Sequence, residues 1–363
     1  MDNYWLERTK ARLDYSERIG YSAMQRILPI YEQALQNINK EINKLYVNYA
    51  DKTGLDVMEL TKILSNADKE NFLLSIQVKM RKLGFNIADV YDPAYIGRLT
   101  RLEAMKQQIY WEIQSIAPRE LEISESAYSK IIEESYSASR RDIREYLGRD
   151  YRGFAHIDDM TKYQILRENW QGGNYSTRIW ANNAILNSRI EEVLPRVVGG
   201  GLVSGISQEK MQRQIREHFD VSRYYAMRLV RTETNYFTNQ AELQSYIDEG
   251  IEYYRYEAIL DKRTSKICRE LNGQVFKVSE AEVGVNYPPL HPSCRSDTTV
   301  VFNEEAKREK VWNKIDWQEE LRLRELEEKR KSGKGRDELG IYETQMRGLE
   351  SEGYDRKEME MKL

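Results

Sequence analysis

Two cysteines and one histidine are the residues whose types and spacing could do chemistry. Cys268 and Cys294 are the only cysteines in 363 residues, and His291 is one of three histidines. Three of the seven prolines lie close to His291, between positions 288 and 292. A concentration of rare residue types in a short segment indicates a functional site rather than ordinary packing.

Metal binding is the chemistry that fits these side chains best. Thiolates and imidazoles are preferred zinc ligands, and His291-Pro-Ser-Cys294 places two of them three residues apart, so both can reach one ion from a turn. Cys268 would approach from the loop after a strand, and Asp261 or a water would complete a tetrahedron. We therefore predict a structural zinc site of Cys268, His291, Cys294 and Asp261. The alternative is that both cysteines are reduced packing residues in a loop shaped by proline.

The same residues also allow two enzymatic interpretations. In the first, Cys294 is a nucleophile, His291 its base and Asp261 the orienting group. A base three residues from its nucleophile in a proline-constrained turn has no evident route to that alignment. In the second, Asp261 and His291 serve a metal-dependent hydrolase or nuclease, which is the better enzymatic alternative.

Arg231 and Asn235 lie four residues apart and share one face of a predicted helix, whereas Glu233 lies on another face. Arginine is suited to bidentate pairing with a carboxylate. We therefore predict that Arg231 pairs with Asp261 and holds the loop. This structural role is favoured over a catalytic role of the Arg-Thr-Glu run.

Residues 260–296 resemble the signature of the phage head-morphogenesis proteins, also called Mu-F-like minor head proteins. Family members carry an Asp-x-Arg-Thr turn, a cysteine, an Asn/Asp-Gly hairpin and then Pro-Pro-x-His-Pro-x-Cys-Arg, and each element is present between Asp261 and Arg295. Arg231-Thr232-Glu233, followed by Asn239, matches the preceding helix of the family, and residues 170–180 are similar to its middle region. Some relatives have a cysteine at the position of Ser265, so one potential ligand is missing here.

This resemblance implies a minor capsid protein of the virion or procapsid, assembled in the host bacterial cytoplasm. Its partners would be the portal protein and capsid or scaffold proteins, and its role would be head assembly and DNA packaging or delivery. We assign structural roles to Arg231, Glu233, Asn239 and Arg295, and no catalytic residue. The competing class is a hydrolase, nuclease or toxin-like effector that uses the cysteine and histidine module. A fused catalytic domain would then be expected after residue 303, where a charged helix is predicted instead.

Composition limits the possible partners. The chain is 32% charged with a formal net charge of −3, and its basic and acidic residues are interleaved. Any DNA binding is therefore expected to be weak and non-specific. The N-terminus lacks the apolar region of a signal peptide, and no apolar run approaches the ~20 residues of a membrane span, so we expect no membrane partner.

The pattern of apolar residues predicts a mainly α-helical protein. Long helices are expected over residues 3–50, 93–116 and 119–147, with shorter ones over 57–65 and 68–83. Asn174 or Ser176 would cap a helix to Val197, and the glycines at 199–201 would form a hinge. Ser207 would begin a short helix to residue 219, and Ser222 a longer one to residue 248.

Beyond Gly250 the pattern changes to that of strands. Residues 252–259, 274–278 and 297–302 predict a short antiparallel sheet, with Asn272-Gly273 as a two-residue hairpin turn. Residues from 303 onward predict a charged helical tail that includes Trp312. The predicted organisation is an elongated helical region (1–150), a helical middle region (151–199), a small α+β module (200–303) and the tail (304–363).

Overall fold

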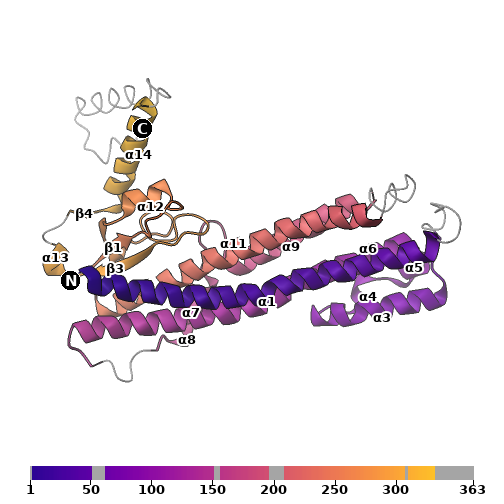
Figure 1. Ribbon diagram of the computed structural model, residues 1–363. Coiled ribbons are helices and arrows are strands. Elements are labelled where there is room, and N and C mark those ends of the chain that lie inside the picture. The colour runs from indigo at the N-terminus through magenta and orange to yellow at the C-terminus, as the bar shows by residue number, and fades with distance from the viewer. Residues whose placement is uncertain (1, 51–61, 151–155, 196–207, 307–309, 332–363) are drawn as a thin grey trace, which may run out of the picture.

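The computed structural model describes residues 2–50, 62–150, 156–195, 208–306 and 310–331. It is mainly α-helical, with a small sheet near the C-terminal end of the described chain (Figure 1). The predicted fold class is therefore confirmed. The boundaries predicted at residues 150, 199 and 303 remain predictions.

Three long helices lie side by side along the molecule (Figure 1): α1 (Asp2–Ala50), α7 (Ile116–Tyr146) and α11 (Gln208–Glu249). Together with α6 (Arg101–Gln114) and α9 (Tyr175–Leu194) they bury a continuous apolar core. The members of this core recur every three or four residues on α1, including Ile27, Tyr31 and Leu35. Burial of such a stripe stabilises long helices more than intrinsic propensity does.

Shorter helices complete the helical part: α3 (Asn66–Lys82), α4 (Ile87–Val90), α5 (Pro93–Gly97) and α8 (Asp159–Arg167). The helix predicted over 93–116 is divided, because Thr100 caps α6 by accepting a hydrogen bond from Glu103 N–H. The predicted break between residues 116 and 119 is also wrong, because α7 begins at Ile116 and includes Pro118. This proline lies in the first turn of α7, where a missing N–H removes no helical hydrogen bond. The helix predicted over 57–65 lies mostly outside the described residues, and residues 62–65 are not helical.

Asn174 caps α9 as predicted, through a hydrogen bond from Thr177 N–H to Asn174 Oδ1 at 3.0 Å. The helix break predicted at Ser222 is wrong. Ser222 is buried inside a continuous α11 of 42 residues, which packs against α1, α7 and α9 and contributes both Phe219 and Ala226 to the apolar core. The predicted glycine hinge at 199–201 and the cap at Ser207 lie outside the described residues.

The sheet has the strand order β3-β1-β2-β4. Strand β1 (Tyr253–Glu257) is antiparallel to β2 (Val275–Lys277) and to β3 (Asp297–Val301), as predicted. Strand β4 (Val311–Trp312) was not predicted, and it pairs with β2 in parallel. The predicted charged helix therefore begins later, as α14 (Lys314–Lys331), after the short α13 (Asn303–Ala306).

The two-residue hairpin predicted at Asn272-Gly273 is also wrong. Helix α12 (Lys266–Leu271) lies between β1 and β2, and Asn272 is its C-cap. Gly273 has a φ of 80°, which suits the residue that ends a helix as well as it suits a hairpin turn. The 3₁₀ turn η2 (Val278–Glu280) then leads away from β2. No described helix is long and apolar enough to cross a membrane.

Candidate metal centre

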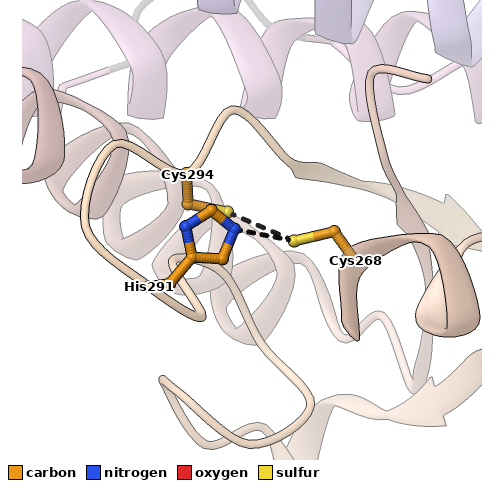
Figure 2. A group of neighbouring side chains, drawn as sticks. All are labelled: Cys268, His291 and Cys294. Atoms are coloured by element: carbon orange, nitrogen blue, oxygen red, sulfur yellow. Dashed lines mark hydrogen bonds between the residues drawn. The ribbon is translucent and has the colours of Figure 1, made fainter. Parts of the chain in front are cut away.

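Cys268, His291 and Cys294 meet between α12 and the loop that leads into β3 (Figure 2). Cys268 Sγ lies 3.2 Å from His291 Nε2 and 3.8 Å from Cys294 Sγ. The three ligand atoms all lie within 4.8 Å of one another, an arrangement that could hold a metal ion. Both thiols are buried, and the imidazole is half-buried.

Helix α12 fixes the position of Cys268. Ser265 caps this helix, and its Oγ accepts a hydrogen bond from Cys268 N–H at 3.3 Å. The position where some relatives have a cysteine is therefore occupied here by the N-cap. The buried hydroxyl of Tyr256 on β1 lies 3.4 Å from Cys268 Sγ and donates a hydrogen bond to it.

A tight turn positions the other two ligands. Cys294 N–H donates to the carbonyl of His291 at 3.1 Å, and Ser293 between them has a φ of 60°. Ser293 N–H donates to Thr232 Oγ1 on α11 at 2.9 Å. The turn is therefore attached to the long helix that precedes it by some sixty residues of sequence.

The His291 ring is oriented for ligation. Its Nδ1 lies 3.0 Å from the carbonyl oxygen of Pro292. A carbonyl only accepts, so Nδ1 carries the proton and Nε2 presents its lone pair towards Cys268. A backbone carbonyl on the second ring nitrogen is the usual way in which proteins fix the tautomer of a metal-binding histidine.

The two thiols titrate as a pair. The pKa of Cys294 is lowered to about 6, first by its hydrogen-bond interaction with Cys268, with burial opposing the shift. The pKa of Cys268 is raised to about 12, first by that same interaction and then by burial. One proton thus leaves the pair easily and the second does so only with difficulty. A bound cation would supply the positive charge that favours the second deprotonation.

Asp261 lies outside this group of three ligand atoms. Its carboxylate accepts hydrogen bonds from Arg295 Nη2 and from Arg263 N–H, both at 2.7 Å. The pKa of Asp261 is lowered, first by the hydrogen bond from Arg295. Its partner is therefore Arg295 rather than the predicted Arg231, whose side chain is exposed. Position 231 lies on the outer face of α11, while its neighbour Thr232 faces the turn.

Glu233 is the acidic residue of the Arg-Thr-Glu run, and it is completely buried. It forms an ion pair with Arg178 on α9 and accepts a hydrogen bond from Trp170 Nε1 at 3.2 Å. Burial is the first cause that raises its pKa to about 7, with Arg178 opposing the shift. Glu233 thus connects α11 to α9 and to the loop before α9.

Asn235 and Asn239 bind the segment that enters β3. Their side-chain nitrogens donate to the carbonyl of Ser296 at 2.9 and 3.3 Å. The carbonyl of Asn239 accepts a hydrogen bond from the buried hydroxyl of Tyr287 at 2.9 Å. Asn235 and Asn239, one turn apart on α11, therefore fix the position of the segment that leads from Tyr287 into β3, which contains His291 and Cys294.

The sequence reasoning missed a second polar group, buried where α1, α7, α11 and β3 meet. Arg12 Nε lies 2.8 Å from Glu242 Oε1, and Arg12 also pairs with Asp142. The buried carboxyl group of Asp297 interacts electrostatically with that of Glu242, and both pKa values are raised, first by burial. Arg12, Glu242 and Asp297 are far apart in the sequence, and no local spacing indicates their contact.

Residues 192–299 match the family model described as "Phage Mu protein F like protein". The match covers just under a third of the chain and contains α11, the strands β1 and β2, the start of β3 and all three candidate ligands. It confirms the family resemblance predicted from the sequence for this segment. Neither the curated proteins nor the solved structures include a significant match to the chain.

Proposed function

We propose that the protein is a phage minor head protein that acts by binding other head components. The observation that carries this proposal is the match of residues 192–299 to the Mu-F-like family. Its place would be the procapsid or virion beside the portal, after assembly in the host bacterial cytoplasm. Its role would be procapsid assembly and DNA packaging or delivery, through contacts with the portal protein and with capsid or scaffold proteins.

The architecture supports a protein that works by contact. Helices α1, α7 and α11 form one long packed body (Figure 1). The module formed by the sheet and α12 is joined to the start of α1. There the ring centroids of Trp5 and of Phe302, the residue after β3, are 5.9 Å apart. The buried hydroxyl of Thr9 donates to the carbonyl of Thr298 on β3 at 3.3 Å. These contacts would keep the module and the far end of the helices at a fixed separation.

We further propose that Cys268, His291 and Cys294 hold a structural zinc ion, with a water as the fourth ligand. The donor set fits, because thiolate sulfur and imidazole nitrogen are the ligands of structural zinc sites. The oriented His291 ring and the acidified Cys294 thiol favour the ligating forms of both side chains. The ion would join α12 to the turn before β3, two segments with little regular structure between them.

Co-expression with the portal protein of the same phage tests the head role. We expect a complex that survives gel filtration, and the chain in purified procapsids at a fixed ratio to the portal by quantitative mass spectrometry. Separate elution across a range of salt, together with absence from procapsids, would contradict the proposal. Cleavage of DNA by the zinc-loaded chain that is lost in His291→Ala would instead favour the hydrolase alternative.

A further inference from the structure

A groove between α9 and α11 has the features of a protein-binding site. A cavity of about 330 Å³ lies between the two helices, and the loop at Trp170 and the metal-site residue Pro292 contribute to its lining. Its volume is at the lower end of the roughly 300–1,000 Å³ typical of binding pockets. The groove is walled mostly by apolar atoms of residues such as Ala181, Ile185 and Leu229.

Large apolar side chains of this groove are exposed to solvent. Ile185 on α9 is 50% exposed, and Val221 and Tyr225 on α11 are 39% and 44% exposed. Val221 and Tyr225 are four residues apart, so they lie on one face of α11 and opposite Ile185 across the cavity. Apolar groups that surround a hollow mark an interaction surface more often than isolated exposed residues do.

The charge of the groove is positive. Arg178, Arg189 and Arg228 line it, and Glu233 is its only acidic lining residue in the described chain. Glu233 is completely buried and already paired with Arg178. The guanidinium of Arg228 lies 4.5 Å from the centroid of the partly exposed Tyr225 ring, which also lines the cavity. Arg189 and Arg228 therefore offer positive charge to whatever enters.

We propose that this groove binds an amphipathic helix of a partner protein, with its apolar face in the cavity and acidic residues beside Arg189 and Arg228. Two helices with a hollow between them offer the parallel walls that helix-in-groove recognition uses. The apolar lining favours a protein over a nucleic acid, whose recognition requires phosphate contacts along its backbone. The groove does not depend on the proposed role in head assembly, since it is defined by its own shape and charge.

Three fluorescein-labelled model helices of equal length test the binding chemistry with the full-length chain. The first has leucines on one face and glutamates on both flanks. The second replaces the glutamates with lysines, and the third replaces the leucines with alanines. Fluorescence anisotropy should show saturable binding of the first helix and at least ten-fold weaker binding of the other two. Equal binding of the glutamate and lysine helices, or no saturable binding of the first, would overturn the proposal.

Variants of the groove locate the site. Arg189→Glu and Ile185→Ser should each weaken binding of the glutamate helix by ten-fold or more, and Arg189→Glu should strengthen binding of the lysine helix. Arg213→Glu and Ile247→Ser are matched controls, because both residues are exposed on α11 and lie outside the cavity lining. The controls should bind as the wild type does. If the groove variants and the controls behave alike, the helix binds elsewhere and the proposal fails.

Discussion

At the scale of single residues, the two thiol sulfurs lie 3.8 Å apart, and the raised pKa of Cys268 means that this thiol keeps its proton. A zinc ion bound there would release that proton and link α12 to the turn before β3. We predict about one zinc per chain in protein purified without a metal-affinity tag, measured by elemental mass spectrometry. A chelator should lower the melting temperature of the wild type by several degrees, because the link is then lost.

Cys294→Ser supplies the control for this zinc prediction. It should melt below the wild type and should not respond to the chelator, since its site no longer holds the ion. Cys268→Ser should behave in the same way. A metal-free wild type whose melting is unchanged by either substitution would leave the cysteines as packing residues.

The buried carboxyl pair of Glu242 and Asp297 gives a pH prediction. Burial, followed by the charge of Glu242, raises the pKa of Asp297, so its neutral form is favoured in the folded protein. Protonated Asp297 contributes to the stability of the folded protein. This contribution is fully present below the ordinary aspartate pKa of about 3.9 and is lost as the pH rises through the raised pKa. Asp297→Asn is neutral at every pH. It should therefore exceed the wild type in free energy of unfolding at pH 8 by at least about 1 kcal/mol, with a smaller difference at pH 5.

Urea unfolding at the two pH values measures this difference. Glu242→Gln is the contrasting variant, because it leaves the buried Arg12 with a weaker set of partners. It should lose roughly 3–5 kcal/mol at both pH values. An Asp297→Asn protein that is less stable than the wild type at pH 8 would show that the charged form of Asp297 is the stabilising one.

At the scale of elements, the close approach of α1 and α11 depends on Gly20. A Cβ placed there would lie 2.3 Å from Thr234 Oγ1, far inside van der Waals contact. Gly20→Ala would ordinarily stabilise a helix by ~1 kcal/mol, but here we predict a loss of about 1–3 kcal/mol from overpacking. Thr234→Ala in the same chain should restore most of that loss, because it removes the clashing hydroxyl.

Gly97→Ala provides the matched control for Gly20→Ala. Gly97 is also helical, and a Cβ at this position meets nothing within 4 Å. Thermal and urea unfolding of the three variants should separate the clash from the change in helix propensity. If Gly20→Ala is as stable as Gly97→Ala, the two helices are not as closely packed as the structure shows.

The elements that sequence reasoning placed correctly are those with strong local signals. The spacing of apolar residues located α1, the Asn174 cap located the start of α9, and the tyrosine-rich run located β1. Ser222 was misjudged because its signal is also local, whereas the continuity of α11 comes from packing on several other helices. Asn272-Gly273 was misjudged because one dipeptide suits two kinds of turn.

The candidate site shows the same division. Cys268, His291 and Cys294 were grouped correctly, because a scarce residue type within a short segment signals proximity in space. The predicted pairing of Asp261 with Arg231 was wrong, because sequence spacing does not show that Arg231 lies on the exposed face of α11. The Glu233–Arg178 ion pair joins two helices, and the sequence of neither helix alone predicts it.

At the scale of the whole molecule, interleaved charge governs what the protein can bind. The formal net charge is −3, and Arg140 and Arg144, in a basic run of α7, both pair with the buried Glu249. Few basic side chains of this run are therefore available to phosphates. We predict that duplex DNA binds weakly and without sequence preference.

The salt dependence of binding measures how many phosphates are contacted. Each neutralised phosphate steepens the logarithmic salt slope by about one unit, so a handful of contacts should vanish well below roughly 0.3 M salt. Gel-shift titrations of several unrelated duplexes across salt would check this expectation, and Arg140→Ala should change the slope little because its charge is already paired. Tight binding at physiological salt that discriminates between sequences would contradict it. Such binding would require a basic surface that contacts bases as well as the phosphate backbone, and the proposed role in packaging would then include direct DNA recognition.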